Sequence, residues 1–243
     1  MLRDRFKKLQ HGHAPEEIQA RLKASSRSLL RDFIYGGIDG AVTTFAVVAG
    51  VAGAKLETQT IIILGFANIL ADGFSMAASN YLGTKSELEE KKLITRYEEK
   101  QIEENPRGEA EEIRQIFINK GIEGEALEEV VKQVTSNREE WLKLMLAEEY
   151  GLGNAEVVPW KSGAMTFLSF MIFGLIPLVP YLLGMSSSFL ASSVATGLAF
   201  FLIGLVKSNW SGASPLRSAI ETLLIGSCAA ALAYVAGNVI AGF

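Results

Sequence analysis

Two aspartates lie inside long apolar stretches of this 243-residue chain, where a charged side chain is costly and is a functional-site hypothesis by default. Asp39 is the only charged residue within 33–54, and Asp72 is the only one within 58–84. Both stretches are long enough to cross a membrane as helices. Asp39, which lies next to Gly40 about two turns into its stretch, is the better candidate.

A polar stripe runs along the second of these stretches. Asp72 and Met76 are four residues apart, and Asn68 and Asn80 continue the same helical face. One interpretation is the lining of a transport pathway. The other is a network of buried hydrogen bonds that holds helices together, and the spacing leaves both open.

Glutamates crowd the segment between residues 85 and 158, and two pairs of positions there suit a metal site. Glu109 and Glu112 are three residues apart, so both side chains leave one helical face. Met145 and Glu149 are four residues apart on another predicted helix. Carboxylates with a thioether favour a transition metal such as Fe(II), whereas oxygen ligands alone suit Mg, Ca and Mn. The alternative is an ordinary solvated acidic surface.

The charges of the chain are unevenly distributed. The sequence is 49% hydrophobic with a mean hydropathy of +0.24. Residues 162–206 contain no Asp, Glu, Lys or Arg, whereas residues 85–161 contain 19 acidic and 12 basic residues, a net charge of −7. This pattern excludes an ordinary soluble globule and a mostly disordered chain. It predicts a membrane protein with one acidic insert.

Gaps between charges predict five transmembrane helices. The uncharged 162–206 stretch would be about 68 Å long as one helix, too long for a single crossing, so it must turn back near Gly184. Glu221 follows Arg217 by four residues and suits an ion pair at the membrane surface. The predicted spans are residues 33–54, 59–84, 162–183, 188–207 and 217–241.

Lysines and arginines predict the orientation of these spans. The N-terminal segment is basic, and so is the loop after the fourth span, which carries Lys207 and Arg217. The turn near Gly184 and the C-terminal tail carry no basic residue. The positive-inside rule then places the N-terminus and the acidic insert in the cytoplasm and the C-terminus on the opposite side. No cleavable signal peptide is expected, and the single cysteine, Cys228, allows no intramolecular disulfide.

Small residues recur at helical spacing in the first and last spans. Gly36 and Gly40 form one such pair, and Ala233 and Gly237 form another. Small residues let helices approach closely in lipid. Both packing within one protomer and a dimer seam remain open from the sequence.

The acidic insert is expected to be helical. The second span continues to Glu104 without a Gly or Pro after residue 84, and Asn105 with Pro106 suits the start of the next helix. The remaining signals are a stop at Gly121, a helix over 124–134, and a Ser136–Glu139 capping box that opens a fourth helix to about Tyr150.

The segment Arg31–Gly40, with the sequence Arg-Asp-Phe-Ile-Tyr-Gly-Gly-Ile-Asp-Gly, resembles the opening of the vacuolar iron transporter family. Ser75-Met76, Tyr81-Leu82 and Lys85-Ser86-Glu87 extend the resemblance, which covers nearly the whole chain. It implies a homodimer that exports Fe(II) from the cytosol by proton exchange, with the translocation path at the dimer interface.

The resemblance also implies roles for individual residues. Asp39 and Met76 match the family's intramembrane metal-binding pair. Gln101 and Leu146 stand where the family commonly has a Glu and a second Met, so one metal position in the insert is expected to be weakened or absent. The residues that match the family's cytoplasmic metal-binding domain are Glu98, Glu109, Glu112, Met145 and Glu149.

Together these observations predict an all-α integral membrane protein, a secondary transporter that exchanges Fe(II), or alternatively Mn(II), for protons. No resident cofactor and no enzymatic activity are expected. The expected partners are divalent metal ions, protons, membrane lipid and a second copy of the chain, and not nucleic acid. The predicted parts are a basic cytoplasmic segment (1–31), the first two spans (32–84), a cytoplasmic metal-binding insert (85–159) and the last three spans (160–243).

The rival interpretation is a membrane-anchored, ferritin-like protein that oxidises iron in the insert. Ferritin-like di-iron sites use Glu-x-x-His pairs, but both histidines, His11 and His13, lie outside the insert. A membrane scaffold with a solvated acidic bundle would leave Asp39 unexplained. The sequence contains no G-x-x-x-x-G-K-[ST] motif, so ATP-driven pumping by this chain is not expected.

Overall fold

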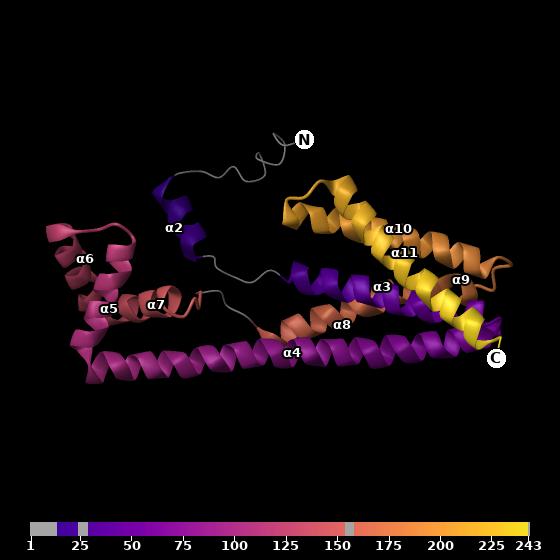
Figure 1. Cartoon of the computed structure of the whole chain (residues 1–243), viewed down its shortest axis with the longest axis horizontal. Helices are drawn as coiled ribbons and strands as arrows, with labels where there is room; N and C mark the ends of the chain where they lie inside the picture. The colour runs from indigo at the N-terminus through magenta and orange to yellow at the C-terminus, as the bar shows by residue number, and fades with distance from the viewer. Residues whose placement is uncertain (1–13, 24–28, 154–157, 243) are drawn as a thin grey trace. The chain divides into compact units, whose positions relative to one another are not determined.

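The structure is a computed structural model that describes residues 14–23, 29–153 and 158–242. The chain divides into two compact units (Figure 1). We call Ser28–Lys85 with Val158–Phe243 the membrane unit, and Met1–Arg27 with Ser86–Val157 the insert unit. His11 and His13 lie outside the described residues.

The membrane unit contains five helical segments that are long and apolar enough to cross a membrane, which agrees with the predicted number. The third differs from the prediction of one regular span, because a 3-10 turn (η1, Ile176–Leu178) interrupts it. Pro177 and Pro180 explain the interruption, since proline cannot donate the backbone hydrogen bond of a helix interior. The segments are α3 (Leu30–Gly53), the first part of α4 (Thr58–Glu104), α8 (Pro159–Leu175) with η1 and α9 (Val179–Leu182), α10 (Ser188–Ser211) and α11 (Pro215–Ile240).

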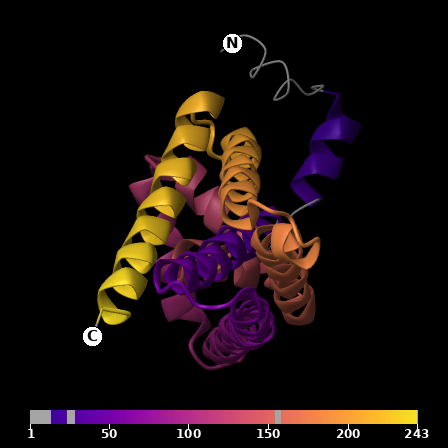
Figure 2. The same cartoon turned by 90° about the vertical axis from the view of Figure 1, so that its right-hand side faces the viewer.

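Helix α3 is the central element of the membrane unit and contacts α8, α10 and α11 (Figure 2). Glycines set these contacts. A Cβ atom at Gly36 or Gly40 would collide with the backbone of α8, and one at Gly237 would collide with the Gly50 carbonyl of α3. The small-residue pairs of the first and last spans therefore pack helices within one protomer.

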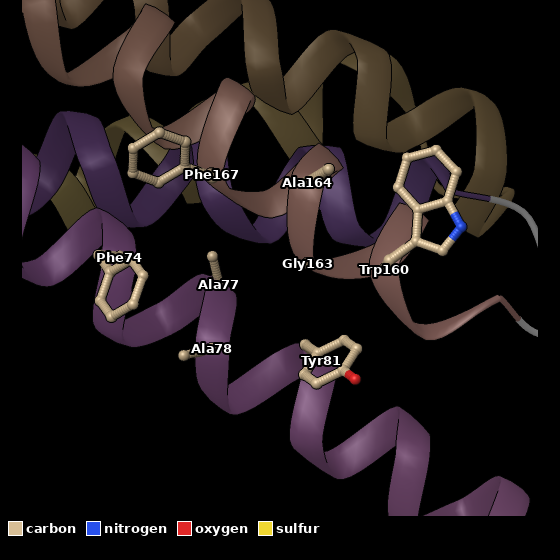
Figure 3. A pocket seen from close by; sticks show the side chains of 8 residues that line it. All are labelled: Phe74, Ala77, Ala78, Tyr81, Trp160, Gly163, Ala164 and Phe167. Atoms are coloured by element: carbon tan, nitrogen blue, oxygen red, sulfur yellow. The ribbon is translucent and has the colours of Figure 1, made fainter.

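A groove of about 360 Å³ lies between α4 and α8 (Figure 3). Phe74 and Phe167 lie toward one end, and Tyr81 and Trp160 lie toward the other. The remaining lining residues are Ala and Gly, so the groove offers no carboxylate to a metal ion. It is a surface suited to hydrocarbon rather than to an ion path.

Helix α4 continues without interruption from the membrane unit into the insert unit, as its sequence predicts. There its last turns pack with α5 (Pro106–Asn119), α6 (Gly124–Ser136) and α7 (Arg138–Glu148). A short α2 (Pro15–Lys23) precedes them in the chain. The apolar core of the insert unit consists of Ile102, Ile113, Leu127, Val131, Trp141 and Met145.

The start of α5 follows the prediction, whereas the start of α7 does not. The Asn105 side chain accepts a hydrogen bond from the Gly108 N–H and caps α5, with Pro106 in the first position. The Ser136 capping box is wrong, because the Ser136 hydroxyl donates back to the Gln133 carbonyl. Asn137 caps α7 instead by accepting from the N–H groups of Glu139 and Glu140. The longer amide side chain, one residue later, reaches the free N–H groups.

Candidate functional site

Four glutamates from three helices form a carboxylate cluster in the insert unit. Glu98 comes from the end part of α4, Glu109 and Glu112 come from α5, and Glu149 directly follows α7. Glu98 and Glu109 are 2% and 4% exposed, whereas Glu112 and Glu149 are exposed. The cluster therefore has two buried and two accessible carboxyl groups, and all four are among the residues that the sequence resemblance singled out.

The electrostatics of the cluster follow from burial and from like charge. Burial, and then the negative charges of Glu112, Glu98 and Glu149, raise the pKa of Glu109 from 4.5 to about 7. Burial also raises the pKa of Glu149, with Glu112 and Glu98 adding to the effect. The raised pKa values of Glu109 and Glu149 favour a bound proton at these two carboxyl groups.

Two oxygen atoms of the cluster are available to a proton or a cation. One oxygen of Glu98 and one of Glu109, Oε2 in each, are buried without a hydrogen-bond partner. Buried carboxylate oxygens without donors are costly unless a proton or a metal ion satisfies them. In the described part of the chain, no three His, Cys, Asp or Glu side chains stand in a geometry that would hold an ion. The four carboxyl groups interact electrostatically, but in this arrangement they do not form a complete metal site.

Tyr150 belongs to this cluster, although sequence reasoning assigned it no role. Its hydroxyl donates a 2.7 Å hydrogen bond to Glu98 Oε1. Burial and the neighbouring Glu98 raise the pKa of the Tyr150 hydroxyl, so it remains a donor at physiological pH. The only sequence signal was its position next to Glu149, because the two bonded residues are 52 positions apart.

Met145 and the two residues that depart from the family pattern, Gln101 and Leu146, lie in different surroundings. Met145 is fully buried in the apolar core of the insert unit, one helical turn before Glu149. Leu146 is also buried. Gln101 donates to the Tyr97 hydroxyl at 2.9 Å. Two nearby glutamates that could replace a missing ligand form ion pairs instead: Glu103 pairs with Arg138, and Glu148 pairs with Lys120.

In the membrane unit, Asp39 is half-buried and lies close enough to Asp72 for the two carboxyl groups to interact electrostatically. Asp72 is exposed on the surface of α4. One turn further along α3, the Thr43 hydroxyl donates to the Asp39 carbonyl at 2.9 Å. Asn68 of α4 donates to that hydroxyl at 3.1 Å. Two carboxyl groups and a short polar network therefore meet where α3 faces α4.

A second hydrogen-bond network lies at the Asn80 end of the polar stripe on α4. The Asn80 amide donates to Asp32 Oδ1 at 3.1 Å and to Thr166 Oγ1 at 2.7 Å. Met76 is half-buried between these two ends, one turn after Asp72 and one turn before Asn80. The hydrogen bonds of Asn68 and Asn80 support a network that joins helices. The lining of a transport pathway stays a prediction.

Two further residues can be placed. Glu221 accepts from Arg217 Nε at 3.1 Å, which confirms the predicted ion pair. Asp32 is a functional candidate that sequence reasoning missed, because it precedes the first predicted span by one residue. It lies seven residues before Asp39, a two-turn spacing that puts both on one face of α3.

The chain is similar to one protein family and to several named proteins. The profile of the VIT family matches residues 30–238. The chain is 34% identical over 215 residues to vacuolar iron transporter 1 of Arabidopsis thaliana, which covers 87% of this chain and 86% of that protein. It is 32% identical over 237 residues to vacuolar iron transporter 1 of Oryza sativa subsp. japonica, with 96% and 92% covered. The vacuolar iron transporter of Plasmodium berghei is 32% identical over 220 residues, with 86% and 81% covered.

Proposed function

Because this chain belongs to the vacuolar iron transporter family, an integral membrane family of metal transporters, we propose that it exports Fe(II) from the cytoplasm in exchange for protons. Mn(II) is the second cargo in this proposal. The relatives carry the names of iron transporters and not of enzymes, which favours transport over catalysis.

The proposal depends mainly on two carboxyl groups, Asp39 and Asp72, which interact with each other. Both lie in helices that are long and apolar enough to cross a membrane. A carboxylate must lose its proton before it ligates a metal, so metal and proton compete for the same oxygen atoms. Protonation of Asp39 from the acidic side would release the metal there. Met76, on the same stripe, adds a thioether that favours Fe(II) over Mg or Ca.

The insert unit supplies the first binding step in this proposal. Its cluster offers buried carboxylate oxygens of Glu98 and Glu109 and accessible carboxylates of Glu112 and Glu149. Among the described residues no ion pair neutralises these four acidic groups, so they would concentrate cations near the cluster. Because the pKa of Glu109 is about 7, a modest fall in pH would displace the metal from it.

Orientation is part of the same proposal. The basic N-terminal segment, Lys207 and Arg217 favour a cytoplasmic N-terminus and insert, with the C-terminus on the opposite side. Single cysteines introduced at residues 207 and 242, in a Cys228→Ser background, should react with an impermeant reagent from opposite sides. Reaction of both from one side would contradict the five-span arrangement.

The proposal includes a homodimer. Asp72 is exposed on the protomer surface in the middle of a span, and a carboxylate facing hydrocarbon is costly. A second copy of the chain that covers this face of α4 would shield Asp72 from lipid and add its own polar stripe to the path. Cross-linking of an Asp72→Cys variant in membranes tests this contact, since a lipid-facing position would give no cross-linked dimer.

One vesicle assay separates the proposal from its rivals. Purified full-length protein is reconstituted into vesicles that contain an Fe(II) indicator, under reducing conditions and with an imposed pH gradient. Uptake of Fe(II) with counter-movement of protons supports the transporter. Oxidation of iron without uptake would favour the ferritin-like rival, and neither would favour a scaffold.

A further inference from the structure

A second carboxyl group in the membrane unit is buried more deeply than Asp39. Asp32, in the first turn of α3, is 3% exposed. Its Oδ1 atom accepts one hydrogen bond, from the Asn80 amide, and its Oδ2 atom is buried without a partner. No ion pair reaches Asp32 within the described part of the chain. A buried carboxyl group with a single neutral donor is an expensive arrangement for a fixed charge.

Close helix packing encloses Asp32. Gly36 lies against the Thr166 backbone, so that α3 and α8 approach each other directly beside the carboxyl group. Gly163, on the wall of the groove in Figure 3, faces the Ala77 carbonyl and brings α8 equally close to α4. The three helices meet around the Asn80 amide, which also lies 3.3 Å from the Ser162 carbonyl.

The surroundings of Asp32 suit a proton and not a metal ion. A divalent metal needs several donor atoms, but the atom that faces Asp32 Oδ1 is an N–H donor of Asn80. The nearest other carboxyl group on its own helix, Asp39, is two turns or about 10 Å further along. A proton needs only the one free oxygen, and Asp32 Oδ2 is such an atom.

Other charged groups at this end of the unit lie on the three packed helices. On α3, Arg31 is exposed, and its guanidinium stacks on the Tyr35 ring. On α8, the exposed Lys161 lies over the Trp160 ring. On α4, Lys85 is exposed, and Asp72 lies two turns before Asn80. No hydrogen bond joins these groups to Asp32 in the described residues, so its carboxyl group is held by neutral groups alone.

We propose that Asp32 is a proton-binding site of the transport cycle, separate from the metal-binding residues. This inference rests on the proposed proton exchange and assigns one exchanged proton to a particular atom. Asp32 lies near the start of α3, and it is bonded to Asn80, the last residue of the polar stripe on α4. In this proposal Asp39 binds the metal, and Asp32, seven residues earlier on α3, carries one of the exchanged protons.

The test uses full-length protein in vesicles with Fe(II) under reducing conditions. Two quantities are measured for each variant: accumulation of Fe(II) against its own gradient when a pH gradient is imposed, and tracer exchange between equal Fe(II) pools without a pH gradient. Asp32→Asn keeps the size of the neutral acid but cannot release a proton. Accumulation driven by the pH gradient should fall by about tenfold, within the range typical of coupling between two sites, while tracer exchange should stay close to wild type.

Two variants serve as controls. Thr166→Val removes a polar group from the same network without removing an acid, so it should keep pH-driven accumulation. Asp32→Glu restores an acid and should recover part of the accumulation. Asp39→Asn, by contrast, should lose accumulation and exchange together, because a metal ligand is gone.

The outcomes separate this assignment from the proposed function. Retained accumulation in Asp32→Asn, or equal loss of accumulation and exchange, would overturn the assignment even if wild type exchanges protons. If wild type shows no proton coupling, antiport and the assignment fail together. Should Asp32→Asn not fold, modification of wild type by a hydrophobic carbodiimide decides the matter, because that reagent attacks protonated carboxyl groups. A peptide-mapped adduct on Asp32 that disappears at alkaline pH supports the proposal, and its absence overturns it.

Discussion

The insert unit and the membrane unit arrange acidic groups in different ways. In the insert unit, four glutamates from the end of α4, from α5 and from the residue after α7 gather near an apolar core, and two of them, Glu98 and Glu109, are buried. In the membrane unit, polar groups are spaced along α4 at every fourth residue, and each end of the stripe is tied to α3 by an asparagine. The first arrangement concentrates negative charge, and the second distributes it.

Under the proposed function, this difference would separate capture of an ion from its passage. A cluster of like charges attracts a divalent cation strongly and also holds protons, as the pKa of about 7 at Glu109 indicates. A site from which an ion must leave needs weaker binding. The membrane unit would bind an ion more weakly, because its carboxyl groups are few and the hydrogen-bond donors around them are neutral. The two units should therefore respond differently to removal of one charge.

The largest effect is expected for Asp39→Asn. The amide keeps the size and much of the hydrogen bonding of the acid but removes its charge and its exchangeable proton. Fe(II) uptake into vesicles should fall to background, because neither metal binding nor proton exchange survives. If Asp39 only joined helices, the amide would serve about as well, since such hydrogen bonds contribute about 1 kcal/mol in membranes. Initial uptake at matched incorporation is the measurement, and near-normal uptake would direct attention to Asp72.

A smaller effect is expected when the insert loses two charges. Glu109→Gln with Glu112→Gln should weaken Fe(II) binding to the full-length protein by about tenfold to a hundredfold, because half of the cluster is neutral. Uptake should fall by less than for Asp39→Asn, since the membrane site remains. Glu125→Gln with Glu129→Gln on the exposed face of α6 is a matched control for lost charge. Equal weakening by both pairs would mean that the glutamates act only through net charge.

The contrast between the units also explains what the sequence could predict. A stripe on one helix follows from spacing alone, so Asn68, Asp72, Met76 and Asn80 were recognised as one face. The five spans, the uninterrupted α4 and the Asn105 cap follow from local rules of the same kind. Charge gaps and helix breaks are properties of neighbouring residues, and no tertiary contact is needed to read them.

Contacts between helices could not be predicted in this way. Tyr150 bonds to Glu98 across 52 positions, and Asp32 bonds to Asn80 across 48. Asp32 was read as flanking the first span because a charge usually marks its end, whereas close packing at Gly36 buries it. The 3-10 turn at Pro177 is not predicted, because the span is defined by its apolar composition and by its lack of charged residues. The gathering of the glutamates was expected only from a family resemblance, since spacing on separate helices does not establish convergence.

The pH dependence of the insert sharpens the comparison further. The pKa of Glu109 is raised from 4.5 to about 7, so between these values the folded insert holds a proton that the unfolded chain has lost. The free energy of unfolding of the insert should therefore fall as pH rises from 4.5 to about 7. Glu149, whose pKa is also raised, adds to the same trend.

Hydrogen exchange in α5 and α7, corrected for the intrinsic rate at each pH, measures this trend for the insert separately from the membrane unit. Glu109→Gln should flatten it, because the amide does not titrate. Saturating Fe(II) should reverse it, because the ion stabilises the ionised carboxylates that are otherwise repelled. Protection that rises with pH in the absence of metal would contradict the electrostatic account of the cluster.

The smallest effect is expected for Tyr150→Phe, which removes the hydroxyl that donates to Glu98 and leaves the aromatic ring. The hydrogen bond holds Glu98 Oε1, so Oε2 is the oxygen left for a cation. Without it the carboxylate gains freedom that metal binding must remove, and Fe(II) affinity should fall by about threefold, equivalent to one ordinary hydrogen bond. Tyr97→Phe is the matched control, because it loses a hydroxyl bonded to Gln101, a neutral group. An identical change in Fe(II) affinity for both variants would show that Tyr150 has no special part in the cluster. A loss confined to Tyr150→Phe would mean that the insert orients its buried carboxylate before the ion arrives.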